Sequence, residues 1–241
     1  MAKLRVHNIE SGPASSDVAL GIAGDTVAVS SDSLKTNVWK DSGGNTLFQS
    51  DGAGTLSNVN STFSGAGPKL ILSQTASDSE GVAFTSGIDS TYDKYMFVFT
   101  DINCSTDNKT FQFQCRTVGS ETYDTTITST CFQAYNPESG AAWFGYRAGG
   151  QLSQENTYQT LAEEMGNGSD ESSAGILYLF NPASTTYVKQ FYSRFSEYSF
   201  ESRNYNEFVS GYLNTAAVIN GINFKMSSGT FNGTIKMYGV S

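Results

Sequence analysis

Three aromatic residues in one short stretch are the side chains of this sequence best suited to binding a ligand. Tyr135, Trp143 and Tyr146 lie within Gln133–Tyr146, close to the amide of Asn136. Aromatic rings can stack on sugar faces while a few polar groups fix orientation. These three residues are therefore candidate glycan contacts. The alternative, commoner for Trp and Tyr in a β-sandwich, is that their rings pack in the core with the polar tip outward.

Acidic residues are the second chemical candidate, because glycoside hydrolysis needs two carboxyl groups that can be far apart in sequence. The acidic residues considered are Asp101, Glu138, Glu163, Glu164, Asp170 and Glu171. No spacing marks any two of them as a pair. Most lie in predicted loops, where a solvated carboxylate is the ordinary state. We therefore expect no catalytic residues and a protein that is not an enzyme.

The sequence lacks the residues that other kinds of catalysis and metal binding require. The single histidine, His7, lies near the N-terminus, which makes it a poor general base for a nucleophile and leaves too few ligands for zinc. There is no glycine-rich phosphate-binding motif. The run Asp41–Asn45 lacks the closing Glu of a calcium loop and is explained by a turn. We expect no metal and no cofactor.

Composition and charge limit the classes of molecule that this protein is expected to bind. Charged residues make up 15% of the 241 residues, the net charge is −9, and the 14 Lys and Arg are scattered. Nucleic-acid binding requires clustered cations, so nucleic acid is not expected as a partner. An anionic membrane surface is disfavoured for the same reason. No run of apolar residues is long enough to span a bilayer, and Met1–His7 has no apolar region, so we expect no signal peptide.

The three cysteines cannot all pair within one chain. Cys115 continues an alternating run with Phe111 and Phe113 and is predicted to be a buried free thiol. A disulfide from Cys115 to Cys104 or to Cys131 remains an alternative.

Beyond residue 67 the sequence reads as consecutive strands separated by Gly, Asn, Asp and Ser turns, which predicts an all-β antiparallel sandwich. Tyr95, Phe97 and Phe99 share one face of a predicted strand, for example. The predicted strands are 69–73, 81–85, 94–101, 110–117, 125–133, 141–147, 174–180, 187–195, 205–213, 218–226 and 234–238. One helix is predicted over Gln154–Met165, because apolar residues recur there at helical spacing.

Residues 1–66 form a separate Gly- and Ser-rich segment with short β-like runs at 25–29, 37–40 and 46–49. Asp41–Asn45 is a strong turn signal between the last two runs. The few apolar side chains of this segment need a partner surface, so we predict that it attaches the protein to other subunits or proteins. The candidate assembly contacts are Val38, Trp39, Leu47, Phe48 and Leu56. A mobile tail is the alternative. Residues 67–241 form the second predicted domain.

Three stretches resemble the fibre and decoration proteins of tailed bacteriophages, particularly those of marine phages. They are Trp39–Leu56, with its Gly-Asn-Thr-Leu-Phe and Ser-Asp-Gly-Ala-Gly runs, Phe180–Lys189, and the ending Ser227–Gly239. The resemblance implies a jelly-roll-like C-terminal domain, often trimeric, and an N-terminal segment that attaches to the particle. It carries over no catalytic residues.

From this resemblance we expect a non-enzymatic virion protein, made in the bacterial cytoplasm, that acts as a head decoration, head fibre or short tail fibre. Its expected partners are two further copies of itself and other capsid or tail proteins. The alternative is a receptor- or glycan-binding module at a fibre tip. A polysaccharide depolymerase is the third hypothesis, and the absence of long β-helix repeats counts against it.

Overall fold

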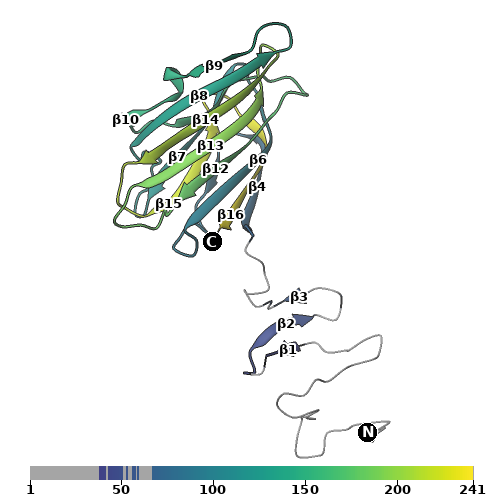
Figure 1. The fold of residues 1–241 in the computed structure, drawn as a ribbon, viewed down its shortest axis with the longest axis vertical. Helices are drawn as coiled ribbons and strands as arrows, with labels where there is room; N and C mark the ends of the chain where they lie inside the picture. Colours follow the sequence, from purple (N-terminus) through teal and green to yellow (C-terminus); the bar gives the residue numbers. More distant parts are fainter. Residues whose placement is uncertain are drawn as a thin grey trace, which may run out of the picture. The chain divides into compact units, whose positions relative to one another are not determined.

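The computed structural model describes residues 38–41, 43–50, 53, 56–57, 59 and 67–240 (Figure 1). The chain divides into two compact units, Met1–Gly65 and Ala66–Ser241. The predicted run Asp25–Val29 lies outside the described residues.

The described part of the first unit is a small antiparallel sheet with strand order β1-β2-β3. Its strands are β1 (Val38–Lys40), β2 (Thr46–Ser50) and β3 (Leu56–Ser57). Asp41 closes the turn between β1 and β2, because its Oδ1 accepts hydrogen bonds of 2.9 Å from the backbone N–H groups of Gly43 and Asn45. The hairpin predicted from this turn is confirmed.

The second unit consists of a nine-stranded and a four-stranded antiparallel sheet. The large sheet has the order β10-β8-β14-β13-β12-β6-β16-β4, with β9 also paired to β8, and the small sheet has the order β11-β7-β15-β5. The strands are β4 (Lys69–Ser79), β5 (Val82–Phe84), β6 (Lys94–Cys104), β7 (Lys109–Thr117), β8 (Ile127–Pro137), β9 (Trp143–Tyr146), β10 (Ser153–Glu155), β11 (Gln159–Met165), β12 (Ser173–Phe180), β13 (Lys189–Tyr198), β14 (Arg203–Leu213), β15 (Ile219–Met226) and β16 (Phe231–Val240).

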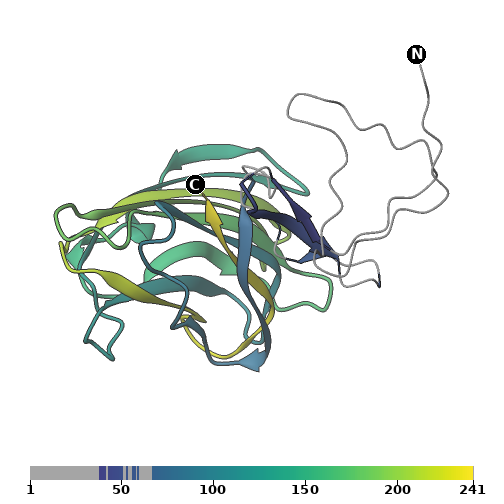
Figure 2. The same cartoon turned by 90° about the horizontal axis from the view of Figure 1, so that it is seen from below.

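The two sheets face each other across an aromatic core (Figure 2). Phe224 of the small sheet lies at its centre, with its ring 5.0 Å from that of Phe99 and 5.4 Å from that of Phe97 on the large sheet. Phe113 and Phe191 make a similar contact, at 5.1 Å. We call the side of the nine-stranded sheet that faces away from this core its outer face.

The all-β antiparallel sandwich predicted from strand alternation is confirmed, and every strand predicted after residue 67 has a counterpart in the structure. Alternation is clearest in β13, where buried and exposed residues succeed each other along most of the strand. The jelly-roll-like connectivity implied by the resemblance stays a prediction.

The predicted helix over Gln154–Met165 is wrong. The segment forms β10 and, after Tyr158, the strand β11. The pairing of β11 with β7 shifts twice, between Thr160 and Ala162 and between Ala162 and Met165. A bulge adds a residue to one strand, so the two shifts stretch the apolar spacing of a strand from two residues to three or four. That spacing imitates a helix.

All three cysteines are buried free thiols, as predicted for Cys115, and neither alternative disulfide forms. The helical structure in the described residues is the three-residue 3-10 turn Ala148–Gly150. No helix in this part of the chain is long and apolar enough to cross a membrane.

Candidate binding groove

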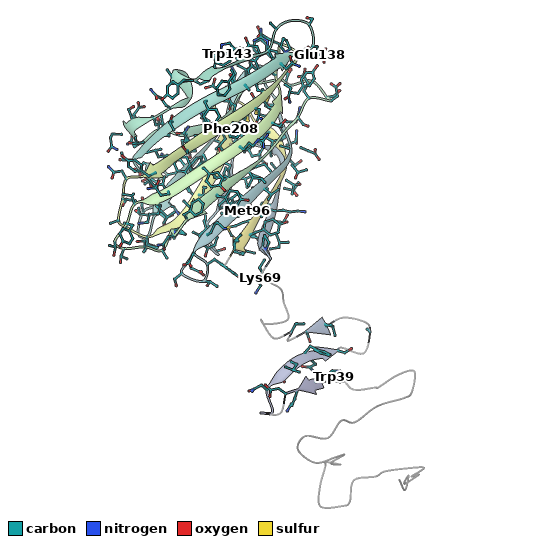
Figure 3. The ribbon with its side chains drawn as sticks, in the orientation of Figure 1. Trp39, Lys69, Met96, Glu138, Trp143 and Phe208 are labelled. Atoms are coloured by element: carbon teal, nitrogen blue, oxygen red, sulfur yellow. The ribbon has the colours of Figure 1, made fainter. Side chains whose placement is uncertain are left out.

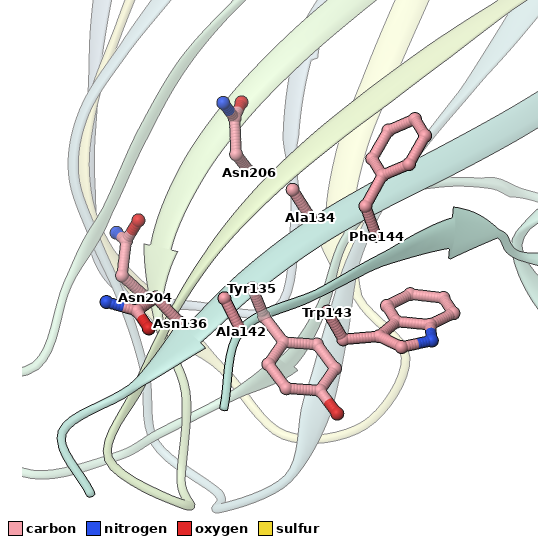
Figure 4. Close-up of a pocket in the computed structure, with 8 residues that line it drawn as sticks. All are labelled: Ala134, Tyr135, Asn136, Ala142, Trp143, Phe144, Asn204 and Asn206. Carbon is pink, nitrogen blue, oxygen red and sulfur yellow. The ribbon is translucent and has the colours of Figure 1, made fainter. Parts of the chain in front are cut away.

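A groove of about 460 Å³ lies where β8, β9 and β14 run side by side (Figure 4). Its lining combines small, amide and aromatic residues, namely Ala134, Tyr135, Asn136, Ala142, Trp143, Phe144, Asn204 and Asn206. The small side chains leave room, and the three amides offer hydrogen-bond donors and acceptors. This mixture of apolar surface and a few polar groups is typical of sites that bind small ligands or sugars.

Strand alternation decides which side chains face the groove. Ala134 pairs with Phe144, and Tyr135 pairs with Trp143, so the two pairs point to opposite sides of the strands. Figure 4 shows Phe144 and Asn206 on one side and the rings of Tyr135 and Trp143 on the other. Phe144 is therefore the main aromatic group over the groove, with 68% of its surface exposed.

The aromatic surface continues from the groove along the outer face. The rings of Phe132 and Phe208 stack, with centroids 4.7 Å apart and planes inclined by 9°. Phe144 packs edge-on against Phe132 at 5.8 Å. Arg194 lies over the ring of Phe208 at 5.1 Å, and Figure 3 shows Phe208 on this broad face. A ligand in the groove would thus meet a wider aromatic platform.

The three predicted glycan contacts do not form one cluster. Tyr135 and Trp143 stack on each other at 5.5 Å, but Tyr146 lies three residues along β9 and points to the other side of it. Trp143 is 39% exposed and Tyr146 is 56% exposed, so the alternative of a core position is wrong for both. Sequence reasoning missed Phe144, although its place between Trp143 and Tyr146 in an exposed aromatic run was a readable signal.

A second series of contacts lies on the other side of the same strands, the side that faces the core. It begins with Trp143 and Tyr135. The ring of Tyr205 packs against Tyr135 at 5.2 Å, and the hydroxyl of Tyr205 lies 2.6 Å from Glu164 Oε2. Arg203 lies over the ring of Tyr135 at 5.0 Å. Burial and the neighbouring Glu164 raise the pKa of Tyr205 to about 12, so this hydroxyl stays protonated and donates to the carboxylate.

Behind the groove, four glutamates gather between the two sheets. Glu197 of β13 and Glu207 of β14 are fully buried, Glu163 of β11 is 7% exposed, and the fourth is Glu164. Gln133 donates a 2.6 Å hydrogen bond to Glu207 Oε1. Glu207 Oε2 and both oxygens of Glu197 have no hydrogen-bond partner.

A single arginine counters part of this charge. Arg147 forms an ion pair with Glu163 and lies 3.9 Å from Glu164. Burial, with added repulsion from Glu163, raises the pKa of Glu207 to about 8. Burial and the charge of Glu207 raise the pKa of Glu197 well above its usual range. At neutral pH, Glu207 is therefore largely protonated, and Glu197 holds its proton to a higher pH than an exposed glutamate does.

These carboxyl groups do not make an accessible catalytic pair in this arrangement. Glu197 and Glu207 are enclosed by the sheets and cannot reach a solvent-borne substrate. The described residues contain no group of His, Cys, Asp and Glu arranged to hold a metal ion. Glu163, which falls in the segment predicted to be a helix, is buried within β11.

Sequence reasoning also missed Glu197 and Glu207 as members of this cluster. Both could have been recognised from the alternation of the strands, because they occupy positions that face the core. Glu197 alternates in step with Phe195, and Glu207 in step with Tyr205 and Val209, all of which are buried. An acidic residue in phase with core aromatics marks a buried carboxyl.

The predicted assembly contacts lie in the small sheet of the first unit. Trp39 and Phe48 pair across β1 and β2 and stack at 5.6 Å. Leu47 is half-buried, whereas Leu56 is 57% exposed and Val38 is 38% exposed. The sheet therefore brings Trp39 and Phe48 together and leaves apolar surface exposed beside them.

Comparison with known proteins adds no relative. No protein-family model, no curated protein and no solved structure matches the chain.

Proposed function

We propose that this chain is a non-enzymatic structural protein of a bacteriophage virion, a head decoration, head fibre or short tail fibre, that assembles as a homotrimer. The support is the resemblance of its three stretches to phage fibre and decoration proteins. Two of those stretches contain defined elements, the small sheet β1-β2-β3 and the strand β16 that ends the sandwich.

The observation that carries the proposal is the small sheet in a unit of its own. Trp39, Phe48 and Leu56 keep part of their apolar surface exposed. Burying such a side chain stabilises an interface by roughly 2 kcal/mol. Repeated in each copy, contacts through Trp39, Phe48 and Leu56 would hold the sandwich on a particle.

Deletion of residues 1–66 tests whether the first unit attaches the protein while the sandwich folds independently. The remaining sandwich has its own core and should stay folded, but it should no longer join particles. Immunogold labelling of intact particles with antibody against residues 67–241 gives the location, over the capsid or at the tail. Normal incorporation of the shortened chain would contradict the attachment role, and unlabelled particles would contradict the virion assignment.

A second role, glycan binding by the sandwich, is supported by the groove. Its amides Asn136, Asn204 and Asn206 lie beside the exposed ring of Phe144, which is the pairing of hydrogen-bonding and stacking groups that a sugar needs. Phe144→Ala should abolish binding to surface glycans of the host without unfolding the protein. Tyr187→Ala is the matched control, because Tyr187 is 69% exposed and lies outside the groove.

A further inference from the structure

The outer face around the groove has an unusual charge pattern. Four adjacent strands, β8, β14, β13 and β12, pair in continuous register, so their outward residues can be read directly. Among those positions, all within the described residues, Arg194 is the one charged side chain and no Asp or Glu occurs. The whole chain carries a net charge of −9. The outward positions of these four strands thus hold one cation and no acid, and a carboxylate lies at the edge of the face, where Glu138 accepts a 3.1 Å hydrogen bond from Tyr198.

Arg194 is held in a fixed position. Its Nε donates a 3.0 Å hydrogen bond to Asn206 Oδ1, and its guanidinium lies over Phe208. These contacts occupy one edge of the guanidinium and one face, and the residue as a whole is exposed at the surface. None of the ion pairs found among the described residues involves Arg194. A guanidinium so oriented is suited to receive two parallel oxygens of an anion.

Asn206 connects this arginine to the groove. Its side chain lines the groove and holds Arg194 at the same time. Arg194 also occupies the same cross-strand row as Phe208 and Phe132. An anionic group on a molecule seated in the groove would therefore meet Arg194 at the groove's edge.

We propose that the groove binds an acidic glycan, in which a sugar packs against Phe144 and a carboxylate of that sugar or its neighbour is bound by Arg194. This inference rests on the proposed glycan-binding role and specifies its ligand class. The lack of acids at the outward positions of these strands matters here, because a carboxylate approaching a protein of net negative charge is otherwise repelled. A carboxylate suits this position because the planar guanidinium can bind both of its oxygens.

The test is binding of the full chain to an array of host-type surface glycans that contains each acidic glycan and its carboxyl-reduced, neutral form. The expected result is binding of acidic glycans with weaker binding of the reduced partners. Arg194→Gln should weaken binding of acidic glycans about 10- to 100-fold, the value of a charge-assisted hydrogen bond, and leave binding of the neutral forms unchanged. Arg194→Lys should retain part of the preference, since it keeps the charge but not the planar fork.

Lys236→Gln is the matched control. Lys236 lies on the same cross-strand row of the outer face, three strands from Arg194 by way of Ile176 and Val98. That separation is about 14 Å at the usual strand spacing. The substitution removes the same charge, and acidic glycans should still bind normally.

The outcomes separate the two hypotheses. Equal binding of acidic and reduced glycans, lost in Phe144→Ala, would overturn the acidic ligand while keeping the glycan site. An acidic preference that survives in Arg194→Gln, or falls equally in Lys236→Gln, would also overturn the role of Arg194. Binding to no glycan, or binding unaffected by Phe144→Ala, would overturn the glycan site itself.

Discussion

Gln133 and Glu207 lie directly opposite each other on β8 and β14 and share a 2.6 Å hydrogen bond from Gln133 Nε2 to Glu207 Oε1. The remaining polar atom of each side chain, Gln133 Oε1 and Glu207 Oε2, is an oxygen that is buried without a hydrogen-bond partner. A proton on Glu207 Oε2 supplies the donor that Gln133 Oε1 lacks. The neutral acid therefore suits this pair better than the carboxylate.

Stability should consequently fall as pH rises. In the unfolded chain a Glu titrates near pH 4.3, so between about 4.3 and 8 the folded protein holds a proton on Glu207 that the unfolded chain releases. The buried carboxyl of Glu197, with Glu163, Glu164 and Arg147 around it, shifts in the same direction. Glu207 should lower the free energy of unfolding by about 1.4 kcal/mol per pH unit inside its window, and Glu197 should act in the same direction.

Glu207→Gln isolates one of these contributions. The new amide cannot ionise and can donate to Gln133 Oε1. We expect urea unfolding at a series of pH values to give a shallower fall in stability, with the variant more stable than the native protein at pH 8. Glu155→Gln, on an exposed edge strand, should keep the native pH dependence. An unchanged slope in Glu207→Gln would contradict the neutral-acid assignment.

The ion pair of Arg147 and Glu163 should behave as a coupled unit. Arg147→Met leaves the nearly buried Glu163 without its counter-ion, which should cost about 3 kcal/mol. Adding Glu163→Gln should recover most of that loss in equilibrium unfolding. Glu121→Gln removes one partner of a pair whose acid is 91% exposed, and it should cost less than about 1 kcal/mol. Additive losses in the double variant would refute the coupling.

Gly145 provides the space into which the indole of Trp143 folds. A Cβ at this position would collide with the indole ring. In a Trp39→Phe background, Gly145→Ala should shift the Trp143 fluorescence to longer wavelength, because the displaced ring becomes more exposed to water. Gly149→Ala is the control, since a Cβ there meets no atom within 4 Å. Identical spectra for the two variants would show that Gly145 does not set the ring position.

Phe224 should be the most costly aromatic residue to remove. Its ring contacts five other phenylalanines of both sheets, namely Phe84, Phe97, Phe99, Phe111 and Phe113. Phe224→Ala should lower the free energy of unfolding by about 3–5 kcal/mol in chemical denaturation. Phe144→Ala, at an exposed site, should leave it nearly unchanged. A loss below about 1 kcal/mol for Phe224→Ala would mean that the core can collapse around the cavity.

The strands could be predicted because alternation is a local property. Tyr95, Phe97 and Phe99 are all buried, as their spacing indicates. Alternation failed at β11, where two register shifts hide the period and Glu164 takes a φ of +56°. Nothing in the neighbouring sequence specifies these shifts, because they follow from the pairing with β7.

The candidate site was predictable only in part. Its residues come from strands that are distant in sequence, and the register in which these strands pair brings them together. The run from Tyr135 to Tyr146 identified the right region and residue types. The three groove amides, the stack of Phe132 on Phe208 and the placement of Arg194 depend on how β8, β14 and β13 align. The carboxyl cluster depends further on how the two sheets face each other.

The three buried thiols allow local opening of the folded protein to be measured through their reactivity. Burial raises the pKa of Cys131 to about 12 and that of Cys115 further still, so neither thiol reacts while its surroundings stay closed. Cys104 lies on β6, Cys115 on the small sheet, and Cys131 beside the carboxyl cluster. The rate at which each accepts a thiol reagent would therefore time the opening of three separate regions, without any engineered label.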